Sequence, residues 1–383
     1  MRTALLIAIL WLAGLGAAAQ FAKIGLILPE LRLVYPEAGT ALGWLVSLIS
    51  IVGMALGLVA GLLAVRIGLK RLLVASLLVG AACSLAQSAL PPFGWMLLSR
   101  VVEGASHLGI VVAAPTLIAQ LAPDRWRGFA MTLWGTFFGV AFALVAWLGL
   151  PLATEGGPGA LFLAHAIAMA GLALLAAFVP AAAPERAPPV GRSILRRHRD
   201  VYASPFTAAP AAGWLFYTIT FVALATILPG TVAPELRAFV AGAMPIASIA
   251  SSMTLGVWLL GRTSAVTVIL LGFGSAAAIA LALSFTQGSA ALPIALFAAL
   301  GLVQGASFAA VPELNGTAAA QSNANGGMAQ TGNIGNGIGT PLMLAILTGA
   351  GFGWTMVAVA VCLLAGLAVH AWLAKKRNAY PAL

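Results

Sequence analysis

The sequence predicts an all-α membrane protein with twelve transmembrane helices in two pseudo-symmetric six-helix bundles. Three observations predict this class: the composition, the number of long apolar runs, and a repeat of short motifs at half the chain length. Apolar residues make up 62% of the 383 residues and charged residues only 7%, with a mean hydropathy of +1.05. Soluble domains carry about 25% charged residues, so we expect lipid to surround most of this surface.

A helix needs roughly 20 apolar residues to cross a bilayer, and the chain contains twelve such runs. Each is predicted to be a helix, because backbone polar groups in lipid must be bonded within their own segment. The predicted spans are 4–28, 41–64, 69–90, 93–121, 128–150, 160–180, 206–228, 236–260, 264–285, 291–313, 326–348 and 353–374. A polar cytoplasmic loop at 181–205 separates an amino-terminal bundle, residues 1–180, from a carboxy-terminal bundle, residues 206–383.

The basic residues of the connecting segments are distributed unevenly across the predicted membrane. Fifteen fall on one side and only Arg32 and Arg237 on the other. This bias predicts that both termini are cytoplasmic in a bacterial-type inner membrane. The net charge of +10 follows from this topology, so nucleic-acid binding is not expected. Cys83 and Cys362 lie inside apolar runs and predict neither a disulfide framework nor a metal site.

Short motifs recur in corresponding spans of the two halves. Glu103-Gly-Ala-Ser106 in the fourth span matches Gln304-Gly-Ala-Ser307 in the tenth. Gly135 and Gly139 in the fifth span match Gly335 and Gly339 in the eleventh. A parallel repeat of six helices predicts a pseudo-two-fold axis along the membrane normal, with a substrate site between the halves.

The loop after the second span resembles a signature of the major facilitator superfamily. It reads Gly-Leu-Leu-Ala-Val-Arg-Ile-Gly-Leu-Lys-Arg from Gly61, and five positions match the signature: Gly61, Arg66, Gly68, Lys70 and Arg71. Val65 stands where the family has an acidic residue that helps to latch the halves on the cytoplasmic side. The resemblance therefore implies a weaker or differently built latch here. Arg100-x-x-x-Gly104 is similar to the family's intramembrane arginine motif.

The resemblance also implies how the halves move. In the family, the second and eleventh spans, and the fifth and eighth, meet across the two halves and slide. Gly53, Gly57 and Gly61 repeat on the second span, and Gly335 and Gly339 on the eleventh. Faces of small residues allow close approach of helix backbones.

Polar residues inside the amino-terminal spans are the first site candidates. Arg100, Glu103 and His107 share one helix face, and Gln20 and Lys23 lie one turn apart in the first span. A charge at the bilayer centre costs at least roughly 2.5–3.5 kcal/mol, so such side chains pair or face a cavity. We interpret them as a patch on the central cavity, in which Glu103 takes up a proton and frees Lys23 or Arg100. The alternative is a static ion pair that fixes helix packing. His107 is an equally good candidate for a proton relay or a helix–helix hydrogen bond.

The carboxy-terminal half offers polar but uncharged candidates. Tyr217, Gln304, Asn333 and Asn336 are placed to orient a substrate, and Gln304 occupies the position equivalent to Glu103. The alternative for these groups is hydrogen bonding between helices, which we prefer for Gln330.

These features favour a proton-coupled secondary transporter for a small organic solute. Lys23 and Arg100 outnumber Glu103, which favours an anion or zwitterion. An efflux pump for amphipathic compounds is the alternative, and the direction of transport and the choice of H⁺ or Na⁺ stay open. Because the four histidines are scattered and a nucleotide-binding loop is absent from the sequence, an enzyme is not expected. We expect a monomer in lipid without cofactor or metal.

Overall fold

The structure is a computed structural model that describes residues 2–180, 194–286 and 288–379. It is almost entirely helical, and twelve crossings can be followed through the described residues. Within the part of the chain that the structure describes, ten helices are long and apolar enough to cross a membrane. The other two crossings are α3, whose apolar part is shorter, and α16, in which Asn and Gln dilute the apolar residues. Residues 181–193 of the expected central loop lie outside the described residues.

The first six crossings pack together as one group of helices. The first four are continuous helices, while the fifth is broken into short segments, and two short elements, α2 (Leu28–Val34) and η1 (Pro36–Gly43), join the first crossing to the second. The first four crossings are α1 (Arg2–Gly25), α3 (Trp44–Ile67), α4 (Leu69–Ser88) and α5 (Phe93–Leu121). The fifth consists of α6 (Asp124–Gly135), α7 (Phe137–Leu144), η2 (Val145–Gly149) and α8 (Leu150–Gly156). The sixth is α9 (Pro158–Ala176).

The last six crossings follow a short helix, α10 (Ile194–Ala203), and form the second group. The eighth crossing is interrupted by a π-helical turn, η4 (Ser252–Gly256), and η3 (Leu228–Thr231) precedes it. The seventh crossing is α11 (Ala208–Ile227), and the eighth consists of α12 (Pro234–Ser251), η4 and α13 (Val257–Leu260). The last four are α14 (Ala265–Phe285), α15 (Ala291–Leu314), α16 (Ala318–Ala350) and α17 (Phe352–Asn378).

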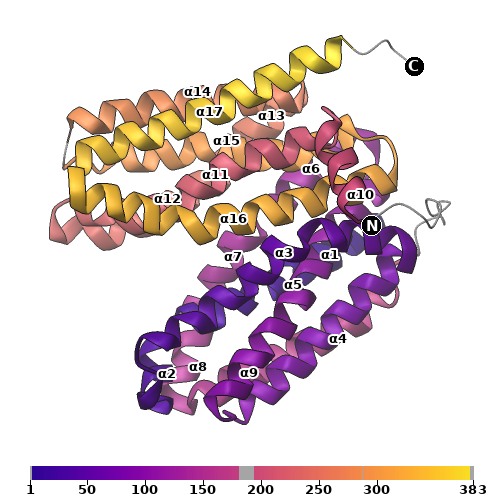
Figure 1. Ribbon diagram of the computed structural model, residues 1–383, viewed down its shortest axis with the longest axis vertical. Helices are drawn as coiled ribbons and strands as arrows, with labels where there is room; N and C mark the ends of the chain where they lie inside the picture. Colours follow the sequence, from indigo (N-terminus) through magenta and orange to yellow (C-terminus); the bar gives the residue numbers. More distant parts are fainter. Residues whose placement is uncertain (1, 181–193, 287, 380–383) are drawn as a thin grey trace.

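The two groups of helices meet at one end and diverge toward the other (Figure 1). They meet near α6, α10 and the first half of α16, where α3 packs along α16 and α6 packs along α15. They separate toward α2 and α8 on one group and the start of α12 on the other. The first turn of α1 and the last turn of α17 lie at the end where the groups meet.

Two helical segments differ from the sequence-based expectation. Helix α10 lies within the segment that we expected to be an irregular loop. Helix α16 begins at Ala318, not at residue 326, because Thr317 caps it by accepting a 3.2 Å hydrogen bond from the Ala320 amide. The polar residues of its first two turns hid this start from a search for apolar runs.

The sequence repeat is visible in the packing of the glycines. A Cβ on Gly104 in α5 would lie 2.8 Å from Val52 in α3, the second crossing. A Cβ on Gly305 in α15 would clash with Ser252 in η4, which belongs to the eighth crossing. Equivalent glycines therefore contact equivalent crossings of the two halves. Gly335 and Gly339 differ from expectation, because they face Thr218 and Ile219 of α11 within their own half.

Candidate functional site

Three charged side chains form one buried cluster among the amino-terminal helices. Lys23 from α1 and Arg100 from α5 both pair with Glu103 of α5, and the Lys23 Nζ to Glu103 Oε1 distance is 2.6 Å. All three residues have an exposed fraction of 0%. The i, i+3 spacing brings Arg100 and Glu103 together on one helix face, and the opposite direction of α1 brings Lys23 to the same depth. We call these three residues the charged triad.

Polar side chains from α4 and α9 complete the surroundings of the charged triad. Lys23 Nζ donates to Ser84 Oγ at 2.6 Å and to Gln87 Oε1 at 2.7 Å. Gln87 Nε2 donates to Glu103 Oε2 at 2.8 Å, and Ser84 Oγ lies 2.7 Å from His165 Nδ1. Ser84, Gln87 and His165 are not among the site residues predicted from the sequence. Ser84 and Gln87 lie one turn apart in an otherwise apolar span, and that spacing is the signal that could have identified them.

Arg100 also ties three amino-terminal helices to one another through backbone carbonyls. Its Nε donates to the Leu45 carbonyl of α3 at 2.7 Å and its Nη2 to the Gln20 carbonyl of α1 at 2.9 Å. These bonds and those of Glu103 use donors and acceptors of the amino-terminal helices alone. The expectation that the charged triad faces the space between the halves is therefore wrong for this conformation. In this state it is a buried ion-pair cluster, the arrangement we weighed as the alternative.

Gln20 and His107 lie beside the charged triad but bond elsewhere. Gln20 Nε2 donates to Ser106 Oγ at 2.9 Å. The His107 Nδ1 atom lies 3.0 Å from the Ala17 carbonyl oxygen, and its ring packs edge-on against Phe21. Between the two hypotheses for His107, this geometry matches the helix–helix hydrogen bond, whereas His165 is the histidine linked to Lys23 and Ser84.

The halves are joined by neutral hydrogen bonds where α3 meets α16. Gln330 Nε2 of α16 donates to the Met54 carbonyl of α3 at 2.8 Å. The Tyr202 hydroxyl of α10 donates to Gln330 Oε1 at 2.7 Å, and burial raises the pKa of Tyr202 to about 12. The three residues link α3, α10 and α16 without a formal charge. We call Tyr202, Gln330 and Met54 the neutral latch.

Small residues let α3 and α16 approach closely beside the neutral latch. A Cβ on Gly57 would lie 2.7 Å from the backbone nitrogen of Gln330, and one on Gly53 would clash with the amide of Asn333. Asn333 Nδ2 bonds to the Ala329 carbonyl of its own helix at 2.7 Å. Asn336 lies one turn further along α16 and is partly exposed.

Two further amide side chains bridge the halves. Gln304 Nε2 of α15 donates to the Gly135 carbonyl of α6 at 2.6 Å, and Asn325 Nδ2 of α16 donates to Thr116 Oγ1 of α5 at 3.0 Å. Gln304 therefore differs from its counterpart Glu103, which points into its own bundle. Asn325, Thr116 and Tyr202 are not among the residues predicted from the sequence, because bonds between distant segments leave no local pattern.

The predicted loop motif forms the turn between α3 and α4. Gly68 adopts a φ of +90°, a conformation that favours glycine and ends α3. Arg66 and Arg71 are exposed and Lys70 is partly exposed. The side-chain surroundings of Gly61 and Val65 lie outside the described residues.

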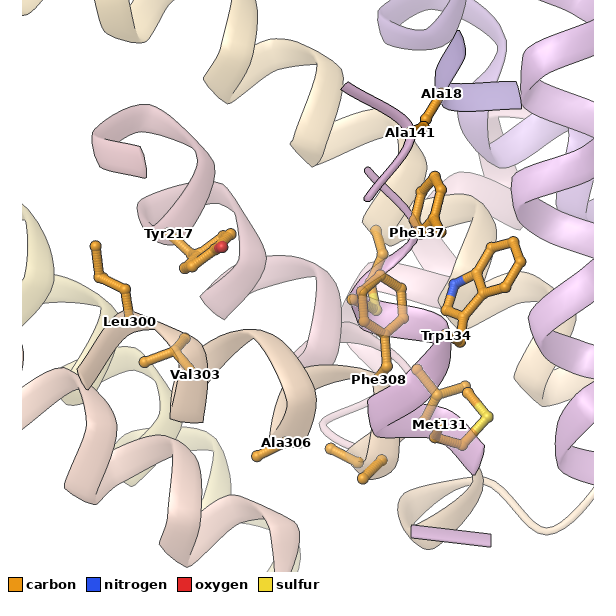
Figure 2. Close-up of a cluster of buried hydrophobic side chains, with 14 of the residues drawn as sticks. Ala18, Met131, Trp134, Phe137, Ala141, Tyr217, Leu300, Val303, Ala306 and Phe308 are labelled. Atoms are coloured by element: carbon orange, nitrogen blue, oxygen red, sulfur yellow. The ribbon is translucent and has the colours of Figure 1, made fainter. Parts of the chain in front are cut away.

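Aromatic rings from both halves pack against one another where α6 and α7 meet α11 and α15. Trp134 stacks on Phe137 with ring centroids 4.6 Å apart and meets Phe308 edge-on at 6.5 Å. Phe308 contacts Trp214 at 5.0 Å, and Trp214 stacks on Tyr217 at 4.6 Å. Figure 2 shows Trp134, Phe137 and Phe308 grouped together, with Tyr217 further away on α11. We call these five rings the aromatic layer.

Comparisons with known proteins agree with this architecture. The crystal structure of the Escherichia coli fucose:proton symporter FucP superposes with a TM-score of 0.79, covering 97% of this chain and 99% of that chain at 16% identity. The sequence is 32% identical to the niacin transporter NiaP of Acinetobacter baylyi over 150 residues, 37% of this chain and 34% of that protein. It is 29% identical to the 3-(3-hydroxy-phenyl)propionate transporter of E. coli over 190 residues, 47% of this chain and 44% of that protein.

These sequence matches span less than half the length of either relative, whereas the structural match spans the whole fold. The sequence pattern described as "Major Facilitator Superfamily" matches residues 10–329. Both the fold and the matched family are those of multi-pass membrane transporters. The chain belongs to the major facilitator superfamily.

Proposed function

We propose that this protein is a secondary active transporter that moves a small organic acid or zwitterion across the bacterial inner membrane by alternating access. The observation that carries the proposal is the asymmetry of the junction between the halves. They meet through uncharged contacts at one end and separate toward the other (Figure 1). Neutral hydrogen bonds contribute about 0.5–1.5 kcal/mol each, so a few of them can be broken and re-formed in each cycle.

The expected orientation places the meeting end in the cytoplasm. Arg66, Lys70, Arg71 and the termini belong to the basic side of the predicted topology. The first turn of α1 and the last turn of α17 lie at this end (Figure 1). The described conformation is then open outward and closed inward.

Two observations favour an acidic solute. The charged triad holds two cations and one carboxylate, which leaves a net positive charge in the amino-terminal half. Two relatives are named for niacin and 3-(3-hydroxy-phenyl)propionate, which are both organic acids. The cations lie inside the bundle, so in this state their effect on a solute is a long-range field.

Proton coupling is proposed to act through Glu103. Protonation of this carboxylate would remove the charge that holds Lys23 and Arg100, loosening the bonds that Arg100 makes to α1 and α3. Because the charged triad is buried, the proton must reach it through the amino-terminal helices. Gln87 Nε2 also bonds to Ser99 Oγ at 2.9 Å, and Ser99 is partly exposed, so this side of the charged triad leads toward the surface, where water would deliver the proton.

The test uses purified protein in liposomes with an imposed proton gradient and nicotinate as the solute. Glu103→Gln is expected to abolish accumulation driven by the gradient while solute exchange at equilibrium continues. Glu103→Asp, which keeps a titratable carboxyl, is the matched control and should retain gradient-driven accumulation. Normal accumulation by Glu103→Gln would overturn proton coupling through this residue. Exchange of no organic acid by the wild-type protein would overturn the substrate proposal.

A further inference from the structure

The aromatic layer contains two buried hydrogen-bond donors without partners. Among the described residues, neither the Tyr217 hydroxyl nor the Trp134 indole nitrogen has a hydrogen-bond partner. Tyr217 is 2% exposed and Trp134 is 0% exposed, so water does not solvate either group in this conformation. An unpaired buried donor destabilises a protein. Folded proteins contain few such groups, so two of them at one junction call for an explanation.

The two donors belong to opposite halves of the transporter. Tyr217 lies on α11 and Trp134 on α6, with Phe308 between them. In Figure 2, the Tyr217 oxygen lies on the side of its ring that faces Phe308, and the Trp134 nitrogen does the same from the other half. An indole N–H only donates, and a phenol donates readily to an anion. Each of these donors is therefore suited to an acceptor-rich group such as a carboxylate.

Partly exposed rings flank these donors on both halves. Trp214 and Phe221 both stack with Tyr217, at 4.6 Å and 5.1 Å between ring centroids. Phe138, next to Phe137, contacts Phe21 of α1 at 5.9 Å. Trp214, Phe221, Phe138 and Phe21 are all partly exposed. Exposed aromatic edges and faces bind another planar ring through stacked or edge-on contacts.

We propose that the aromatic layer is the substrate subsite and that it selects organic acids carrying an aromatic ring. The Tyr217 hydroxyl donates to the substrate carboxylate, and the partly exposed Trp214, which packs on Phe308, contacts the ring. This inference rests on the proposed transport of a small organic acid and adds its chemical class. Because the layer takes rings from both halves, substrate bound there contacts both halves and is positioned to follow their relative movement.

The experiment measures binding of 3-phenylpropionate and of 3-cyclohexylpropionate to the purified full-length protein by isothermal calorimetry. The two acids have the same chain length and charge and differ in the aromaticity of the ring. The wild type is expected to bind 3-phenylpropionate at least about tenfold more tightly. Tyr217→Phe is expected to weaken that binding by about tenfold, the loss of one hydrogen bond to a charged group.

Thermal unfolding of the ligand-free variants separates this role from a purely structural one. Tyr217→Phe removes an unpaired donor, so the melting temperature should stay the same or rise. Tyr35→Phe is the matched control, because the Tyr35 hydroxyl donates to the Pro91 carbonyl at 2.7 Å far from the layer. It should lower the melting temperature and leave binding unchanged. A lower melting temperature for Tyr217→Phe with unchanged binding would overturn the proposal.

The outcomes also separate this inference from the proposed function. Equal binding and transport of both acids, with Tyr217→Phe unaffected, would overturn aromatic selection and leave organic-acid transport intact. Failure of the wild type to bind or transport either acid would overturn both.

Discussion

Lys23 Nζ lies 2.6 Å from Glu103 Oε1, and the same carboxylate holds Arg100 through its other oxygen. One anion therefore balances two buried cations. Removing one member of a buried ion pair costs about 3–5 kcal/mol, because the remaining charge is left without compensation. The charge count makes the three positions of the charged triad unequal.

Glu103→Ala is expected to destabilise the protein more than Lys23→Ala. The first substitution leaves two buried cations unpaired, whereas the second leaves the Arg100–Glu103 pair intact. We expect a loss of about 3–5 kcal/mol or more for Glu103→Ala and a smaller loss for Lys23→Ala. Denaturant unfolding in detergent micelles measures both, and equal losses would contradict the pairing described here.

Gln330→Ala is expected to shift the transporter toward the state that is open at the α10 end. The substitution removes the hydrogen bonds to the Met54 carbonyl and from the Tyr202 hydroxyl, each worth about 0.5–1.5 kcal/mol. The bond to Met54 is the one that joins the two halves, and its loss corresponds to a change of about two- to tenfold in the conformational equilibrium. Distances between spin labels at Glu155 and Glu235, which lie on the ends that diverge, measure the shift.

Tyr202→Phe provides the graded comparison for the neutral latch. It removes one of the two hydrogen bonds and should give a smaller shift in the same direction. A distance distribution identical to that of the wild type in Gln330→Ala would show that the neutral latch does not hold the halves together.

Gly57→Ala is expected to reduce transport by preventing close packing of α3 against α16. The added methyl group would lie 2.7 Å from the Gln330 backbone, which cannot move aside as a side chain can. Gly171→Ala in α9 is the matched control, since nothing lies within 4 Å of a Cβ there. Exchange rates in liposomes compare the two, and equal rates would contradict the proposed close approach.

The neutral latch should be insensitive to salt and to pH below about 10. Burial raises the pKa of Tyr202 to about 12, which means that the folded protein favours the protonated phenol. Its contribution is therefore fully present below the usual phenol pKa of 10 and is lost as the pH rises through about 12. Spin-label distances in Glu103→Gln, where the proposed coupling group cannot titrate, should not change between about pH 6 and 9. A change in that range would show that a different group controls closure.

The sequence predicted the class of fold because lipid imposes simple conditions on composition and length. Helix α5 covers the predicted span 93–121, and α14 and α15 differ from their predicted spans by one residue at a boundary. Helix α16 was predicted less well, since its first turns are polar and buried against other helices, not against lipid. The short helix α10 carries charged residues and gives no apolar run at all.

By itself the sequence determined the membrane class, the family and the charged residues that are too costly to place in lipid without a partner. The spacing of Arg100 and Glu103 fixed one ion pair, because it acts within a single helix. Only the tertiary structure decided where those charges point, since rotation of α5 by a fraction of a turn separates a residue inside the bundle from one facing the other half. The partners Ser84, Gln87 and His165, the neutral latch and the aromatic layer all join segments far apart in the chain. Such contacts depend on how whole helices pack against one another, and that packing leaves no pattern along the sequence.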